Sequence, residues 1–86
     1  MGRDEPELQA LSRMLAVQVA AERARRGLTQ ADLAALCATT QSAVARLERG
    51  NRPPRLDTLL RIANALDCEL DVRLRPRTLP VRSAER

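Results

Sequence analysis

The chain has 86 residues, a formal net charge of +4 and no histidine, phenylalanine, tryptophan or tyrosine. This length allows one domain with a small core, near the size at which folding alone becomes marginal. All 15 basic residues are arginines, which indicates nucleic acid or another acidic partner, with plain solubility as the alternative. Without aromatic rings the chain cannot stack on unpaired bases, so duplex DNA is favoured over single strands.

Other classes of function are disfavoured by what the sequence lacks. It holds no carboxylate pair, metal-ligand cluster or glycine-rich phosphate loop, so we expect neither catalysis nor a cofactor. No apolar run could span a bilayer and the acidic start MGRDEPE is unlike a signal peptide, which predicts a cytoplasmic protein without a membrane partner. In a reducing compartment Cys37 and Cys68 are interpreted as core residues, with redox sensing or a disulfide as the alternative.

The first predicted helix follows a short N-terminal tail, residues 1–6, and runs to about Arg26. Pro6 suits its first turn, where acidic residues favour the positive end of the helix dipole. Gly27 ends the helix. Its apolar stripe is predicted at Leu8, Leu11, Leu15 and Val19. The first two of these could pack on a second copy as readily as on the domain itself.

Residues 28–50 predict two short capped helices joined by a tight link, which is the spacing of a helix-turn-helix. Thr29, with Asp32 three residues later, caps the first helix, and Thr40 caps the second. Gly50 can end the second helix in the left-handed conformation. The side chains expected to point inward are Leu33, Ala34, Cys37, Val44 and Leu47; those left outside on the second helix are Gln41, Ser42, Ala45, Arg46 and Arg49.

A rigid basic loop, residues 52–55, precedes a fourth helix predicted over about Leu56 to Leu66. Its core residues are expected at Leu56, Leu59, Ile62, Ala63 and Leu66. From Glu69 to Arg75 the pattern changes to alternating apolar and charged residues, the signature of a half-buried strand. Residues 76–86 contain two prolines and little to bury, which predicts a disordered tail.

A lone strand cannot satisfy its own backbone, so this one is predicted to pair antiparallel with its copy in a homodimer. With the two-fold axis at Val72, each acidic residue faces an arginine and Leu70 faces Leu74. An axis at Asp71 or Arg73 brings like charges together, and a one-residue slip mixes leucines with charges. An intramolecular or frayed strand is the alternative. The residues assigned to dimerisation are Glu69, Leu70, Asp71, Val72, Arg73, Leu74 and Arg75.

Five stretches of the chain carry a resemblance to a known family: Gly27-Leu28-Thr29-Gln30, Asp32-Leu33-Ala34, Thr39-Thr40-Gln41-Ser42, Arg46-Leu47-Glu48-Arg49-Gly50, and Leu56 to Leu66. They resemble the lambda/434-type repressors, also called the XRE family, over roughly residues 15–67. The resemblance implies a mainly α fold with a four-helix, lambda-repressor-like helix-turn-helix domain, which we place at residues 7–67. The dimerisation strand, at 68–75, would then replace the fifth helix that is usual in the family.

The resemblance also implies roles for individual side chains. The base-reading residues would be Gln41, Ser42 and Arg46, because Gln can pair with adenine and Arg with guanine through two hydrogen bonds. Contacts to the DNA backbone or minor groove are implied for Gln30, Thr40, Arg49, Asn51, Arg52 and Arg55, and a structural salt bridge for Arg23 and Glu48. Ordinary solvated side chains are the alternative for the first helical turn and for the loop. Two departures from the family are Glu22, next to positions that are often apolar, and Arg55, in place of a capping serine or threonine.

A dimer of this kind is expected to repress transcription by binding an inverted repeat in double-stranded DNA, with half-sites about one helical turn apart. A chain this short leaves no room for an effector domain, so its switch is expected to come from a partner or from its own abundance. The layout looks like the HipB-type antitoxins, which pair through a strand, repress their own operon and bind a HipA-type kinase toxin; a HigB-type toxin is the second choice. A stand-alone repressor without a toxin and a basic protein-interaction module are the alternatives.

Overall fold

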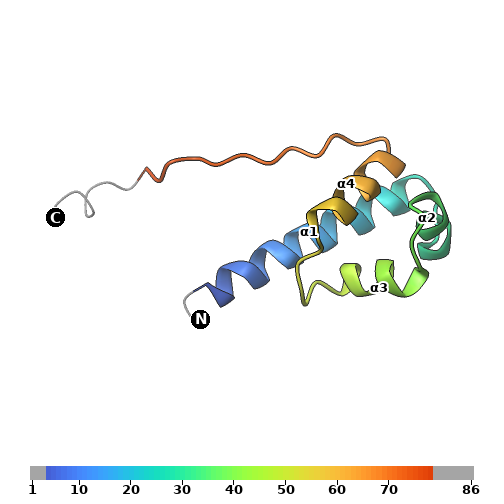
Figure 1. The fold of residues 1–86 in the computed structure, drawn as a ribbon, viewed down its shortest axis with the longest axis horizontal. Helices are drawn as coiled ribbons and strands as arrows, with labels where there is room; N and C mark the ends of the chain where they lie inside the picture. The colour runs from blue at the N-terminus through green and yellow to red at the C-terminus, as the bar shows by residue number, and fades with distance from the viewer. Residues whose placement is uncertain (1–3, 79–86) are drawn as a thin grey trace, which may run out of the picture.

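The computed structural model describes residues 4–78, and four helices fill most of this range. They are α1 (Glu5–Arg25), α2 (Gln30–Leu36), α3 (Gln41–Arg49) and α4 (Leu56–Ala65). Figure 1 shows α1 as the longest element, with the chain beyond α4 running back along the molecule on the side away from α3. The prediction of a mainly α, four-helix domain with a helix-turn-helix is therefore confirmed.

The first helix begins two residues earlier than the domain start predicted at residue 7. Pro6 lies in its first turn together with two glutamates, as expected for the positive end of a helix. Residues 1–3 of the predicted tail lie outside the described residues. At the other end, Gly27 adopts a φ of +67° after the last turn, so the predicted stop is confirmed.

The buried face of α1 differs from the predicted stripe. Leu8 and Leu11 are 41% and 51% exposed, whereas Ser12 and Ala16 are buried together with Val19. The two leucines are therefore not buried within one chain, and their alternative packing on a second copy stays a prediction. The buried serine satisfies its hydroxyl locally, because that hydroxyl donates to the carbonyl oxygen of Leu8 at 2.8 Å.

Small side chains face inward on α1 because the end of α3 lies against this part of the helix. A Cβ added at Gly50 would lie 3.2 Å from the Cα of Arg13 and 3.3 Å from the Cβ of Ala16. No leucine could stand between the two backbones at that separation. Because this contact joins residues that are far apart in the sequence, the spacing of the leucines along α1 does not predict it.

The caps of α2 and α3 are confirmed. The backbone amide of Asp32 donates to the Thr29 hydroxyl and the amide of Thr29 donates to the Asp32 carboxylate, both at 2.9 Å. Hydrogen bonds from the backbone amide and then the hydroxyl of Thr29 lower the pKa of Asp32. Thr40 accepts from the amide of Ala43 at 3.1 Å, and the link between the two helices turns at Ala38 with a φ of +58°.

The core lies where α2, α3 and α4 meet α1. Leu33 is 0% exposed and Val44 and Ile62 are each 1% exposed, as the spacing predicts. Cys37 is buried as a free thiol, and burial raises its pKa; Cys68 is half-buried against the core. Both findings agree with the interpretation of the cysteines as core residues.

The prediction that Leu56 lies in the core is wrong, because this residue is 67% exposed. It is the first residue of α4, and the buried face of that helix is set further along by Leu59, Ile62 and Ala63. Arg55 occupies the cap position and its side chain makes no capping hydrogen bond, which confirms that the usual cap is missing here.

Beyond α4 the chain is extended but unpaired. Leu70 packs against the core, whereas Val72 and Leu74 are 70% and 98% exposed. Residues 4–78 of a single chain supply no neighbour with which this segment pairs. The strand at 68–75 and its pairing across a dimer therefore stay predictions. Most of the predicted disordered tail, residues 79–86, lies outside the described residues.

Replacing Gly50 by alanine is expected to destabilise the domain by about 2–3 kcal/mol. The residue has a φ of +73°, which strains any L side chain, and its Cβ would press on the backbone of α1 at 3.2 Å. Gly27 is a matched control, because its φ is +67° but nothing lies within 4 Å of its Cβ position. We expect Gly27→Ala to cost about 1 kcal/mol in thermal unfolding. Equal losses for the two variants would contradict the importance of the contact between α3 and α1.

Candidate nucleic-acid interface

The surface of α3 carries a row of polar side chains that is open to solvent. Its exposed residues are Gln41, Ser42, Arg46 and Arg49, whereas the opposite face of the helix is buried. The Thr40 cap fixes the start of the helix, so the first two of these residues stand in its first turn. The structure thus brings the three predicted base-reading side chains to one accessible face of one helix.

Three arginines border a shallow hollow beside this helix. The hollow, of about 210 Å³, lies between α3 and the loop before α4 and is lined by Arg46, Arg52 and Arg55 together with the two loop prolines. Arg55 makes a long ion pair of 3.3 Å with Asp57, and both side chains are more than half exposed. Such an exposed pair contributes little, so the cluster keeps its positive charge. A phosphate oxygen is the kind of ligand that this arrangement suits.

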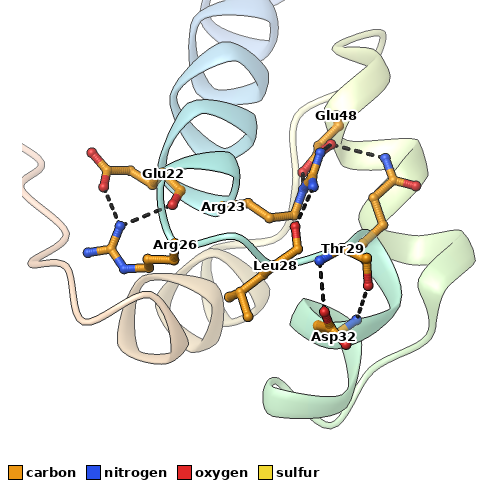
Figure 2. Close-up of polar contacts among 8 residues, drawn as sticks. Glu22, Arg23, Arg26, Leu28, Thr29, Asp32 and Glu48 are labelled. Carbon is orange, nitrogen blue, oxygen red and sulfur yellow. Dashed lines mark hydrogen bonds and ion pairs between the residues drawn. The ribbon is translucent and has the colours of Figure 1, made fainter.

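The orientation of α3 is fixed by an ion pair with α1. The guanidinium of Arg23 donates to both carboxylate oxygens of Glu48, through Nε at 2.7 Å and Nη2 at 3.0 Å (Figure 2). Its third donor, Nη1, reaches the carbonyl oxygen of Leu28 at 2.7 Å. The two side chains are only 18% and 8% exposed. One arginine therefore ties the helix that carries the polar row to α1 and to the loop before α2.

The pKa values of this pair reflect how closely its members are bound. Burial alone would raise the pKa of Glu48, but the hydrogen bonds from Arg23 and Gln30, with the arginine charge, outweigh it and lower the pKa. The hydrogen bonds to Glu48 raise the pKa of Arg23 against the opposing effect of burial. Both groups are therefore held in their charged forms.

The remaining predicted backbone contacts lie around this centre. Gln30 is half-buried at the start of α2, where its amide donates to a carboxylate oxygen of Glu48 at 3.0 Å and leaves its own oxygen and a second N–H for other partners. Thr40 uses its hydroxyl oxygen as a cap, which leaves the O–H free to donate. Asn51 is exposed directly after α3.

A second polar cluster, which the sequence did not reveal, ties the end of α1 to the segment after α4. Arg26 donates to Glu22 at 2.6 Å (Figure 2). It also approaches the sulfur of Cys68 at 3.8 Å. Hydrogen bonds first from Arg26 and then from Arg25 lower the pKa of Glu22. The glutamate that departs from the family pattern is thus accommodated by two neighbouring arginines. Only the four-residue spacing along the helix could have signalled this contact.

Within residues 4–78, no three His, Cys, Asp or Glu side chains gather where they could hold a metal ion. None of the helices described is both long enough and apolar enough to cross a membrane.

Comparison with known proteins agrees with this geometry. A family model described as helix-turn-helix matches residues 19–72, which is more than half of the chain. The match begins in the second half of α1, includes α2, α3 and α4, and ends at Val72 in the extended segment. No curated protein matches the chain.

Proposed function

Because the chain belongs to the XRE-type helix-turn-helix family of DNA-binding regulators, we propose that it is a repressor that reads double-stranded DNA with Gln41, Ser42 and Arg46. The observation that supports this most is the exposure of these side chains on a helix held at Glu48 by a nearly buried ion pair. Gln41 is suited to adenine and Arg46 to guanine in the major groove, and Ser42 to either.

The residues around α3 would hold the DNA backbone. The arginine hollow and Arg49 offer positive charge next to the reading face, and Gln30, Thr40 and Asn51 offer neutral donors. Arg55, at the far side of the hollow, is proposed to enter the minor groove. Such contacts fix register without reading sequence.

We propose that two copies act together as a homodimer on an inverted repeat. The pairing would be the antiparallel ribbon centred on Val72, in which Glu69 faces Arg75, Asp71 faces Arg73 and Leu70 faces Leu74. In support, the segment is extended and exposes its apolar face at Val72 and Leu74. A chain that stays monomeric in sedimentation equilibrium at micromolar concentration would contradict the ribbon.

The biological role that we propose is that of an antitoxin that represses its own promoter and binds a toxin protein. The support is the resemblance of its layout, a four-helix body followed by an alternating apolar and charged segment, to the HipB-type antitoxins. A HipA-type kinase is the toxin that this comparison favours, and a HigB-type toxin comes second. Finding a toxin-like gene adjacent to this one would support the proposal. Finding none would favour the stand-alone repressor.

A footprint of the purified chain on the DNA upstream of its own gene tests the proposal. We expect protection of two half-sites about one helical turn apart. Affinity should fall steeply with salt: if Arg49 and Arg52 each neutralise one phosphate in each half-site, log K against log salt has a slope of about −4. Absence of a footprint together with a flat salt response would favour the protein-interaction module instead.

A further inference from the structure

An apolar groove runs between α1, α4 and the segment after α4. It has a volume of about 260 Å³, and the apolar side chains that line it include Leu15 and Val19 of α1, Leu59 and Ala63 of α4, and Leu70 of the segment. Leu15 and Leu70 are half-buried at its edges. No residue of α3 lines the groove, so DNA contacts made by that helix do not account for it.

Two rows of apolar side chains lead out of this groove in the same direction. On α1, Leu11 and Leu8 follow Leu15 toward the N-terminus at about 6 and 10 Å, from a helical rise of about 1.5 Å per residue. On the segment, Val72 and Leu74 follow Leu70 at about 7 and 13 Å, from a strand rise of about 3.3 Å. The two rows therefore extend from the groove over a similar length. Figure 1 shows the segment turning back toward the N-terminal end of α1.

These rows do not cover each other within one chain. Leu11 and Leu8 are 51% and 41% exposed, and Val72 and Leu74 are 70% and 98% exposed. Moreover, every residue of α1 from Glu5 to Leu11 is exposed, so the first two turns of the helix lie outside the core of the domain. Together the exposed leucines and valine form one apolar wedge, Leu8, Leu11, Val72 and Leu74, that widens away from the groove.

We infer that a second copy of the chain fills this wedge, with its own residues 70–74 packed against Leu8 and Leu11 of α1. The inference rests on the ribbon proposed above and extends it from strand pairing to a contact between strand and helix. In the register centred on Val72, the partner's Leu74 lies beside Leu70, at the mouth of the groove. The partner's Val72 then lies at the level of Leu11. Because the contact is isologous, each copy covers the wedge of the other.

The charges around the wedge favour this occupant. The same register sets Glu69, at the groove, opposite an arginine of the second copy, and Asp71 opposite another. The register therefore pairs every charged residue of the strand with one of opposite sign. A second copy thus matches the apolar wedge and, beside it, the charged positions of the segment.

The test is the dimer dissociation constant of the full chain, measured by sedimentation equilibrium. In Leu8→Ser/Leu11→Ser we expect a rise of at least about 30-fold, because both side chains lose burial in both copies. Val17→Ser is the matched control: this residue is 67% exposed on the same helix, on the face opposite Leu8, and we expect no change. Circular dichroism should show helical content like that of the wild type, since the substituted side chains lie outside the core.

Two further measurements separate this inference from the proposals on which it rests. Binding to a duplex with one half-site, taken from the footprint, reports on the DNA-reading surface of one copy and should be the same in Leu8→Ser/Leu11→Ser as in the wild type. If Leu70→Ser/Val72→Ser/Leu74→Ser dissociates the dimer while Leu8→Ser/Leu11→Ser does not, the ribbon stands and the contact with α1 is refuted. If the wild-type chain is monomeric at every concentration, both the ribbon and the contact with α1 are refuted. Binding to a single half-site would still support the DNA-reading face.

Discussion

Replacing Gln41 and Arg46 together by alanine is expected to reduce affinity for the cognate inverted repeat at least about 1,000-fold, down to the level of unrelated duplexes. Each bidentate contact to a base discriminates by roughly 1–3 kcal/mol, and a dimer would lose four of them. Both side chains are exposed on α3, so the variant should fold like the wild type. Fluorescence anisotropy with cognate and scrambled duplexes at one salt concentration gives the measurement.

The control for lost positive charge is Arg25→Ala. This arginine lies in the last turn of α1 and its side chain is 65% exposed, with one ion pair to Glu22. Its removal should lower affinity for both duplexes slightly and leave their ratio unchanged. If the alanine variant at Gln41 and Arg46 still discriminates between the duplexes, the reading face has been assigned to the wrong side chains.

Glu48→Ala is expected to lower the free energy of unfolding by about 2–4 kcal/mol. Removing one member of a buried ion pair leaves the other charge unpaired, and Arg23 is only 18% exposed. For a domain of this size the loss corresponds to a fall in melting temperature of roughly 10–25 °C. Arg23→Met/Glu48→Met serves as the comparison, because it removes both charges and should recover part of the loss. Purely additive losses in the double variant would show that the two residues are not coupled.

The same pair gives the stability a defined dependence on pH. The pKa of Glu48 is lowered in the folded chain, so its contribution is complete above the pKa of an unfolded glutamate, about 4.3. That contribution is lost as the pH falls below this value and through the lower pKa of the folded state. Glu48→Gln cannot titrate, and its unfolding free energy should therefore fall less between pH 5 and 3 than that of the wild type.

The sequence predicted most accurately the features that depend on near neighbours. The caps at Thr29 and Thr40 and the left-handed glycine at position 50 are each set within a few residues, and all are present. A capping residue and its hydrogen-bond partner three or four residues away are brought together by local backbone geometry, independently of the rest of the chain. The exposed row on α3 follows in the same way from one helical period and one buried face.

The predictions that failed or stay open concern burial and pairing that depend on contacts between distant parts of the molecule. The close approach of Gly50 to Ala16 places a small residue of α1 in the core, and Leu8 lies in turns of the helix that extend past the core. No local pattern could reveal either. Leu56 fits the period of α4 yet stands at its first residue, beyond the reach of the core. The strand at residues 68–75 depends on a neighbour that a single chain does not supply, so its alternating pattern remains a prediction.

The extended segment after α4 runs on the side of the molecule away from α3 (Figure 1). In the repressor that we propose, a partner protein bound at this segment would therefore dock on the side of the domain opposite α3. Occupancy of the promoter and binding of that partner are then expected to be compatible. Control by a bound protein would then act through stoichiometry and spacing between neighbouring dimers, rather than by competition for the duplex.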